Sequence, residues 1–248
     1  MLYLFMKYFF LVMALNEEKF LNKTLNELKQ AITDNHLNNY EIIIIDDGST
    51  DNTYKIAMNF IKNNKNIRVV KNPKNLGLAK NIKLFINKSS DDGKLILVSG
   101  DNDLNINLIN RLIVASRTNE LVLSYFVNRE KKGYFRATIS TLFNFICCTL
   151  FGVYAFYLQG PFVWPMRNIR NLSIYSNGIA YVSEVNIKLL LSGLKFTEIP
   201  GLMNTGSDGS TSIKLKNLVD IFFTLIHLIK EIYVLKKYKK KINRNLHL

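Results

Sequence analysis

The chain has 248 residues, 48% of them apolar, so it can bury a sizeable core and is not an intrinsically disordered protein. Its formal net charge of +14 indicates an anionic partner, although a composition rich in Lys and Asn accounts for the charge equally well. Cys147 and Cys148 are adjacent and only three histidines exist, so a disulfide scaffold, a Cys/His metal site and a Ser-His-Asp enzyme are poorly supported.

Strand and helix patterns alternate along the first hundred residues. We predict strands over residues 7–13, 41–45, 67–70 and 95–99, because each is a short apolar run. Helices are predicted over residues 17–32 and 78–86. Another is predicted to begin at Asp51, its N-cap, and to include Phe60 and Ile61. The first run lacks the basic start and the cleavage site of a signal peptide. The alternation predicts a single α/β domain, with a mainly parallel sheet between two layers of helices.

The second half of the chain is less regular. Residues 104–115 and 184–191 are predicted to be helical, and residues 121–127 to form a strand. Residues 139–158 are almost uniformly apolar and reach the roughly 20 residues that a membrane span needs, although Asn144 and Gly152 interrupt them.

Residues 218–235 predict an amphipathic helix, because Asp220, Thr224, His227 and Glu231 recur on one helical stripe. A strongly basic tail follows, and this combination is typical of an interfacial membrane anchor. The alternative is a helix packed on the core, followed by a solvated tail. We therefore expect a domain over residues 1–216 and a membrane-associating segment over residues 217–248.

Two carboxylates follow the strand predicted over residues 41–45. Asp46 and Asp47 come directly after it, and Gly48 then begins a turn that leads to Asp51. Ligands of open α/β sheets bind at the carboxyl ends of strands, where these carboxylates could accept hydrogen bonds from a nucleobase and a ribose. The alternative is a turn that only caps the next helix.

A second carboxylate pair, Asp101 and Asp103, follows the strand predicted over residues 95–99. In extended backbone, residues two apart point to the same side. Such hard oxygen ligands suit Mg²⁺ or Mn²⁺, which would bridge to a nucleotide diphosphate. Pairs of this kind are also common in surface loops, so the pair alone is weak evidence.

Taken together, four segments resemble the family 2 inverting nucleotide-sugar glycosyltransferases, which have the GT-A fold. They are residues 13–18 (Met-Ala-Leu-Asn-Glu-Glu), 46–51 (Asp-Asp-Gly-Ser-Thr-Asp), 75–81 (Asn-Leu-Gly-Leu-Ala-Lys-Asn) and 101–103 (Asp-Asn-Asp). Met13 and Leu15 depart from the usual Pro and Tyr. The resemblance implies that Asp101 and Asp103 hold Mg²⁺ or Mn²⁺ for catalysis. The donor-binding residues that it implies are Ala14, Asn16, Glu17, Asp46, Asp47, Gly48, Lys80 and Asp101.

The second half looks like the dolichyl- and polyprenyl-phosphate sugar synthases within that family. Residues 192–200 and 209–212 carry this resemblance, which implies a loop of Gly209, Ser210 and Thr211 over the diphosphate. The usual basic residue before that loop is missing, so Lys214 or Lys216 would neutralise the diphosphate. Glu184 falls on the acidic position of a helix.

A basic cluster of Arg129, Lys131, Lys132 and Arg136 lies just before the apolar residues 139–158. We expect Arg129, Lys132 and Arg136 to bind the phosphate of a polyprenyl-phosphate acceptor, although a solvated basic loop is the alternative. A phosphate acceptor needs no general base, whereas an enzyme that extends a glycan or a lipid-linked oligosaccharide would use Glu184. A catalytically silent membrane-bound scaffold is the third reading.

The expected partners are a UDP- or GDP-sugar, a polyprenyl phosphate and a membrane surface. We expect the protein at the cytoplasmic face of the membrane, peripheral or monotopic. No nucleic acid is expected, because only the charge points to one and no binding motif accompanies it. Whether the chain forms a homo-oligomer is left open.

Overall fold

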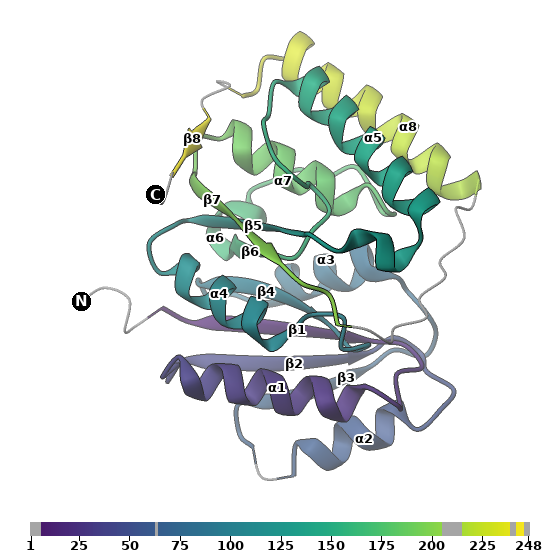
Figure 1. The fold of residues 1–248 in the computed structure, drawn as a ribbon, viewed down its shortest axis with the longest axis vertical. Coiled ribbons are helices and arrows are strands. Elements are labelled where there is room, and N and C mark those ends of the chain that lie inside the picture. The colour runs from purple at the N-terminus through teal and green to yellow at the C-terminus, as the bar shows by residue number, and fades with distance from the viewer. Residues whose placement is uncertain (1–5, 63, 205–214, 239–241, 246–248) are drawn as a thin grey trace.

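The structure is a computed structural model that describes residues 6–62, 64–204, 215–238 and 242–245. In these ranges one sheet runs through the molecule, with strand order β3-β2-β1-β4-β6-β5-β7-β8 (Figure 1). The strands are β1 (Tyr8–Ala14), β2 (Tyr40–Asp46), β3 (Ile67–Lys71), β4 (Lys94–Ser99), β5 (Leu121–Phe126), β6 (Phe162–Pro165), β7 (Lys195–Gly201) and β8 (Asn243–Arg244). The helices are α1 (Leu21–Asp34), α2 (Thr53–Phe60), α3 (Leu78–Lys88), α4 (Ile106–Ser116), α5 (Tyr134–Phe151), α6 (Met166–Arg170), α7 (Tyr181–Leu191) and α8 (Leu215–Ile229).

The central strands are parallel and covered on both faces. β1 pairs in parallel with β2 and β4, whereas β6 runs antiparallel to both β4 and β5. Successive side chains of a strand point to opposite faces of the sheet. Phe9 and Leu11 accordingly share a buried cluster with α3 and α7, and Phe10 and Val12 share one with α1 and α4. This is the three-layer α/β arrangement expected from the sequence (Figure 1).

Most elements predicted from periodicity are confirmed. The five predicted strands end within one residue of their observed bounds, and the helices of the second half are found as α4 and α7. The first helix begins at Leu21 rather than at Glu17, because the preceding residues form a turn held by other loops. β6 and β7 were not predicted as strands.

Helix α5 begins before the apolar segment predicted from sequence and ends inside it. The helix stops at Phe151, where Gly152 adopts a left-handed conformation with φ 65°. The Asn144 side chain donates to Ala155 O and accepts from Leu158 N, which folds the following residues back along the helix. Residues 139–158 therefore do not form one continuous helix. Among the described residues, α5 is the one helix long and apolar enough to cross a membrane.

The described part of residues 217–248 packs against the rest of the chain. Leu228 and Ile232 are buried in the same cluster as α7, and β8 pairs in parallel with β7. Arg244 on β8 forms an ion pair with Glu198, with 2.7 Å between Nη2 and Oε2. The basic tail is thus partly engaged within the protein rather than wholly solvated.

Candidate active site

The parallel strands bring the sequence motifs to one edge of the sheet. Ala14 ends β1 and lies in register with Asp46, the last residue of β2. Met13 lies in register with Ser99, the last residue of β4, after which Asp101 follows. The carboxyl ends of β1, β2 and β4 therefore meet, which is where open α/β sheets bind ligands.

Asn16 joins two of the loops at this edge. Its Oδ1 accepts a hydrogen bond from Thr50 N at 2.9 Å, and its own backbone N–H donates to Ser49 Oγ at 2.9 Å. The residue adopts φ 57°, a left-handed conformation that Asn tolerates better than most residues. Asn16 therefore ties the two loops together, and its side-chain oxygen is engaged by the neighbouring loop.

Asp46 and Asp47 play different parts, although they are adjacent. Asp47 accepts hydrogen bonds from Leu76 N, Gly77 N and the Asn72 side chain, at 2.9, 2.9 and 2.7 Å. Burial raises the pKa of the Asp47 carboxyl, but the hydrogen bonds outweigh it and hold the pKa below its ordinary value. Asp47 thus stays ionised and fixes the turn before α3.

Asp46 is fully buried and has an unused acceptor. Its Oδ1 accepts from Ser49 N at 3.0 Å, whereas its Oδ2 has no hydrogen-bond partner among the described residues. Buried polar atoms in native proteins are almost always paired, so an unpaired carboxylate oxygen indicates a missing donor. This oxygen has no accessible surface, so a ligand could reach it only if the loop around it moved.

Gly48 allows the loop after Asp47 to lie directly on the turn before α3. Its φ is 84°, and an added Cβ would lie 2.6 Å from the carbonyl carbon of Lys74. Lys80, expected to bind the donor, is exposed on α3 beyond this turn. The neighbouring Asn81 is buried and accepts from the Asn72 side chain at 2.7 Å, so it supports the Asp47 network.

The Asp101–Asp103 turn is held from two sides. Asp101 Oδ1 accepts from Asp103 N at 3.1 Å, and the buried Asn102 between them donates to Glu27 on α1 at 2.9 Å. From the other side, Asn204 N donates to Asp103 O at 3.0 Å, and its side chain donates to Asn102 O at 2.9 Å. Asn204 was not singled out from the sequence, because no local pattern marks it.

Glu17 adds a third carboxylate to this region. Burial and, after it, the negative charges of Asp101, Asp51 and Asp103 together raise the pKa of Glu17 to about 7. Asp101 and Asp103 offer carboxylate oxygens, the hard ligands that Mg²⁺ and Mn²⁺ prefer. The residues present therefore fit a divalent cation.

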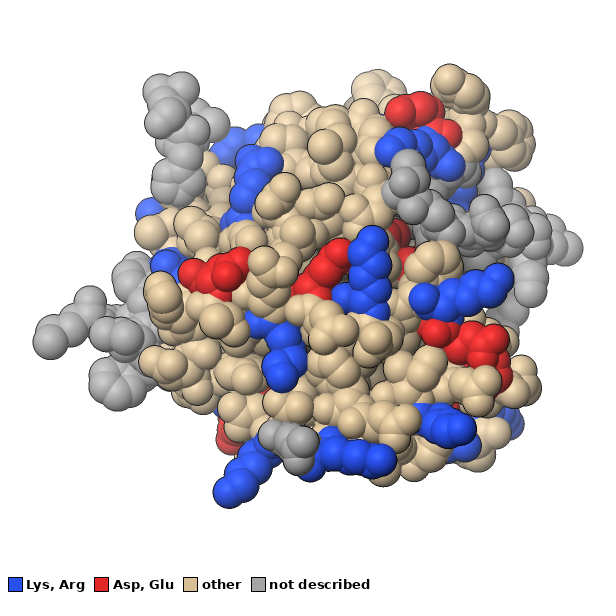
Figure 2. All heavy atoms as spheres, turned by 60° about the horizontal axis from the view of Figure 1, so that its bottom comes forward, with Lys and Arg blue, Asp and Glu red and all other residues tan. Residues whose placement is uncertain are grey.

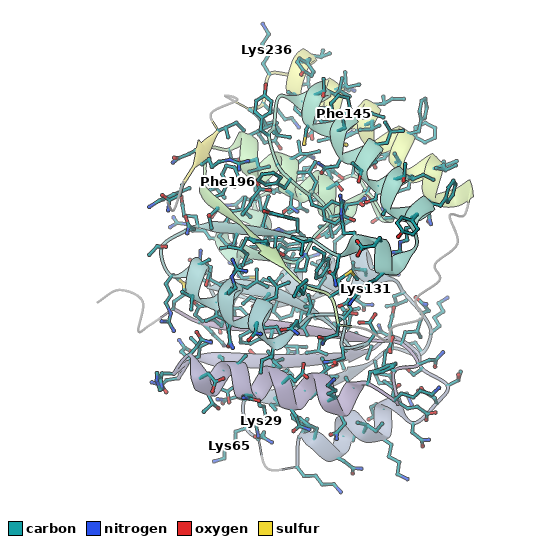
Figure 3. All side chains as sticks on the ribbon, in the orientation of Figure 1. Lys29, Lys65, Lys131, Phe145, Phe196 and Lys236 are labelled. Carbon is teal, nitrogen blue, oxygen red and sulfur yellow. The ribbon has the colours of Figure 1, made fainter. Side chains whose placement is uncertain are left out.

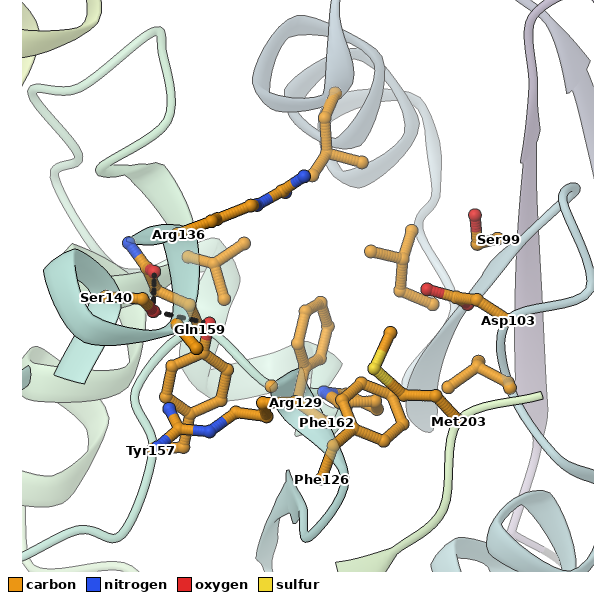
Figure 4. Close-up of a pocket in the computed structure, with 17 residues that line it drawn as sticks. Ser99, Asp103, Phe126, Arg129, Arg136, Ser140, Tyr157, Gln159, Phe162 and Met203 are labelled. Carbon is orange, nitrogen blue, oxygen red and sulfur yellow. Dashed lines mark hydrogen bonds between the residues drawn. The ribbon is translucent and has the colours of Figure 1, made fainter. Parts of the chain in front are cut away.

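A cavity of about 220 Å³ adjoins the Asp101–Asp103 turn. In Figure 4, Ser99 and Asp103 lie on one side of it and Arg136 on the other. Between them lies an apolar floor that includes Phe126, Phe162 and Met203. The cavity thus has an acidic side and a cationic side, separated by apolar side chains.

The basic cluster predicted from the sequence is divided by the structure. Arg129 and Arg136 both line the cavity. The Arg129 guanidinium lies over the Tyr157 ring, 4.6 Å from its centroid, and donates to Thr141 Oγ1 at 3.0 Å. Arg136 comes from the first turn of α5. The Lys132 side chain lies outside the described residues, as do Gly209, Ser210, Thr211 and Lys214.

Glu184 does not fit the role of general base. It is fully buried, and its carboxylate accepts from Tyr175 N and Ser176 N at 2.9 and 2.8 Å. The same carboxylate pairs with Lys188 Nζ at 2.7 Å. All of these contacts are internal, so the Glu184 carboxylate has no access to an acceptor hydroxyl. This corrects the expectation from the sequence.

Glu184, His227 and Glu231 also converge closely enough to suggest a second metal site. The Lys188 ammonium already lies between the two carboxylates, 2.7 Å from Glu184 Oε1 and 2.5 Å from Glu231 Oε2. That position is thus taken by a cation of the protein itself, and the cluster is an internal ion-pair network.

On the face seen in Figure 2, Lys and Arg side chains do not form a continuous basic patch of the kind that binds nucleic acid. Lys and Arg side chains there are interspersed with Asp and Glu. The view gives no support to a continuous basic surface of the kind that binds a phosphate backbone.

Comparison with known proteins agrees with this site. The model of glycosyl transferase family 2 matches residues 10–168, well over half of the chain. The structure of glucosyl-3-phosphoglycerate synthase from Mycobacterium tuberculosis, in complex with Mn²⁺, UDP and phosphoglyceric acid, is similar, with a TM-score of 0.67 and 18% identity. That match covers 92% of this chain and 79% of the synthase. Residues 1–349 of TarS from S. aureus are similar with a TM-score of 0.51 and 17% identity, covering 75% of this chain and 56% of that one. A search of curated proteins found no match.

At such low identity the structural matches show the fold, and the family match covers all four motifs at the edge of the sheet. The chain therefore belongs to glycosyl transferase family 2 and is a glycosyltransferase with the GT-A fold.

Proposed function

We propose that this glycosyltransferase moves a sugar from a nucleotide-sugar donor to a polyprenyl phosphate, with inversion, at the cytoplasmic face of a membrane. One observation carries the proposal: Arg129 and Arg136 line the same cavity as Asp103. Asp103 and the side chains of both arginines therefore line one space. Helix α5, which supplies Arg136, also exposes large apolar side chains on its outer side.

The donor side of the proposal rests on the oxygen ligands at the sheet edge. Asp101 and Asp103, with Glu17 nearby, would hold Mg²⁺ or Mn²⁺ at the edge where β1, β2 and β4 end. Such an ion, when bound, stabilises the negative charge that grows on the departing diphosphate. The structure of the mycobacterial synthase contains Mn²⁺ and UDP, which supports a divalent ion and, of the two expected donors, a UDP-sugar for this chain.

The acceptor side rests on nucleophile chemistry. A phosphate monoester has a second pKa near 6 and is largely dianionic at pH 7, so its oxygen can attack the anomeric carbon without a base. As the new bond forms, the bond from the anomeric carbon to the diphosphate breaks, and the nucleoside diphosphate leaves. Arg129 and Arg136 would offset the repulsion between the two anionic substrates. The burial of Glu184 agrees with a reaction that needs no carboxylate base.

A second candidate is a phosphorylated, water-soluble acceptor. The mycobacterial synthase was solved with phosphoglyceric acid, an anion that two arginines could also bind. Its nucleophile would be a hydroxyl, which needs a base within hydrogen-bond reach. Two further readings are extension of a glycan with Glu184 as base, which its burial disfavours, and a silent membrane-bound scaffold.

Transfer assays separate these readings. The full chain is given a short polyprenyl phosphate, Mn²⁺ and radiolabelled UDP- or GDP-sugars, and is then extracted with organic solvent. An acid-labile labelled lipid should appear. Arg129→Ala and Arg136→Ala should lower kcat/KM for the lipid by roughly tenfold or more, with donor affinity unchanged. Lys131→Ala is the matched control, because Lys131 is a nearby exposed cation that does not line the cavity.

Other products would contradict the proposal. Label found only in a soluble phosphorylated acid would establish the second candidate. Transfer only to glycans, lost on Glu184→Gln, would restore Glu184 as base. Failure to turn over any donor, in transfer or in hydrolysis, would favour the scaffold.

A further inference from the structure

Helices α5 and α8 lie side by side at one end of the molecule (Figure 1), and each exposes large apolar side chains. Phe145 on α5 is 65% exposed, and Phe222 on α8 is 59% exposed. Soluble monomers rarely expose large contiguous apolar patches, and such patches mark interaction surfaces. The further exposed apolar side chains of the two helices are Tyr134, Phe135, Leu142, Ile146, Leu218, Val219, Phe223, Ile226 and Ile229.

The polar stripe of α8 is turned toward the protein, and this leaves the apolar face outward. Asp220 accepts hydrogen bonds from Ser176 Oγ and Ala180 N, both at 3.0 Å. Glu231, just beyond the helix, is buried against Lys188 at 2.5 Å. A surface helix in water normally does the reverse, with its apolar stripe on the core. Polar and ionic contacts therefore fix which side of α8 faces outward.

Helix α5 has protein along its inner side over its whole length. Arg136 and Ser140 line the cavity, Asn144 holds the following loop, and Cys147 and Phe151 are buried in the cluster that contains Leu228 of α8. A helix packed in this way lies along the surface of the domain, over about 27 Å for its 18 residues. Its exposed side chains lie at the same end of the molecule as those of α8, which points to one joint surface rather than to a separate membrane span.

Charge at the borders of this face matches a phospholipid surface. Residues 134–151 contain no Asp or Glu, and the two acids of α8 and the turn after it face inward. Lys131, with Glu130 beside it, lies at the N-terminal end of α5, and Lys236 lies beyond the C-terminal end of α8 (Figure 3). Basic side chains around an apolar face suit lipid phosphates around an acyl layer.

We propose that α5 and α8 form a single surface that inserts into one leaflet of a bilayer, with both helices parallel to the membrane plane. This deepens the proposed membrane location, but it does not depend on the acceptor. Insertion of the exposed apolar side chains into the leaflet supplies most of the binding free energy, and the basic residues add a smaller, salt-sensitive contribution. Binding to vesicles should therefore persist with neutral lipid and at high salt.

The test uses the full chain and sedimentation with phosphatidylcholine vesicles, with and without anionic lipid, at 0.1 and roughly 1 M salt. Wild type should bind both vesicle types at both salt concentrations. The variant Phe222→Ser/Phe223→Ser should lower the partition coefficient at least about tenfold. Val114→Ser is the matched control, because Val114 is equally exposed but lies on α4; it should bind like wild type. Unchanged thermal midpoints show that the variants are folded.

Depth of insertion separates a helix in the membrane plane from a spanning helix. Phe145→Trp and Phe222→Trp place a reporter on each helix, against a native Trp164 that is fully buried. Quenching by lipids brominated near the headgroup should be stronger at both sites than quenching by lipids brominated at the chain ends. Deep quenching at position 145 alone would overturn the proposal in favour of a span.

Two further results would overturn it. Binding only to anionic vesicles, lost at high salt, would mean electrostatic attachment. Failure to bind vesicles, with a dimer that Phe222→Ser/Phe223→Ser converts to a monomer, would make a second copy the occupant of this face. Vesicle binding as expected without any labelled lipid product would leave this inference standing and reject the polyprenyl-phosphate acceptor.

Discussion

Removing the Lys188 ammonium tests how α8 is held with its polar stripe inward. Lys188 Nζ lies 2.7 Å from Glu184, 2.5 Å from Glu231 and 2.6 Å from Ser173 O, and the side chain is fully buried. Lys188→Met leaves two carboxylates buried without their cation. Breaking a buried pair in this way costs about 3–5 kcal/mol. In a chain of this size, that corresponds to a fall in Tm of about 6–20 °C.

The control variant, Lys237→Met, removes a cation that pairs with the same Glu231 carboxylate from the solvent side. Lys237 pairs with Glu231 at 2.5 Å, but its side chain is 47% exposed, so Lys237→Met should cost at most about 1 kcal/mol. Both variants are compared with wild type by thermal and urea unfolding. Equal effects of the two substitutions, or an unchanged midpoint for Lys188→Met, would refute the view that buried charge holds α8.

Four further outcomes follow from the site and the core. Glu184→Gln should lower the unfolding free energy by about 1–3 kcal/mol but leave kcat of the folded enzyme unchanged; a large loss of kcat would make it catalytic after all. Asn204→Ala should weaken Mn²⁺-dependent donor binding by up to about tenfold, measured by calorimetry, since it removes side-chain support from the metal turn; unchanged affinity would show that this support is dispensable. Gly48→Ala should abolish donor binding, because its Cβ would meet the Lys74 backbone at 2.6 Å; normal binding of a donor would show that the two loops can move apart. Burial lowers the pKa of Lys94 to about 8, so the unfolded chain binds more protons than the folded chain above pH 8. The free energy of unfolding should therefore rise from pH 8 to about 9.5. Urea unfolding of Lys94→Met should show a smaller rise with pH than wild type, and an identical slope would contradict this prediction.

The sheet and the donor edge were predictable because their signals are local. Strands such as β2 are continuous apolar runs, and the acids that follow them lie at the carboxyl edge in any parallel sheet. Arg129 and Arg136 were grouped by sequence proximity alone, and the cavity does bring them together.

The roles that depend on distant partners could not be predicted. Glu184 has the sequence context of a functional acid, but its burial depends on Lys188 and on Glu231, which lies 47 residues away by number. Asn204 holds the Asp101–Asp103 turn only because the segment after β7 pairs with Leu104. The sequence periodicity predicts a polar and an apolar face for α8, but it does not show which face packs against the rest of the protein. That choice depends on Ser176 and Lys188, which lie far from α8 in the sequence and contact Asp220 and Glu231.

The central claim is that this edge of the sheet binds a nucleotide-sugar through a divalent cation held by Asp101 and Asp103. Its most direct test is calorimetric titration of UDP- and GDP-sugars into the full chain with Mn²⁺ and with a chelator. We expect one donor class to bind only with Mn²⁺, and Asp101→Asn and Asp103→Asn to weaken that binding by roughly tenfold or more without lowering Tm. Donor binding that is equally tight with the chelator, or unaffected in both variants, would contradict the account.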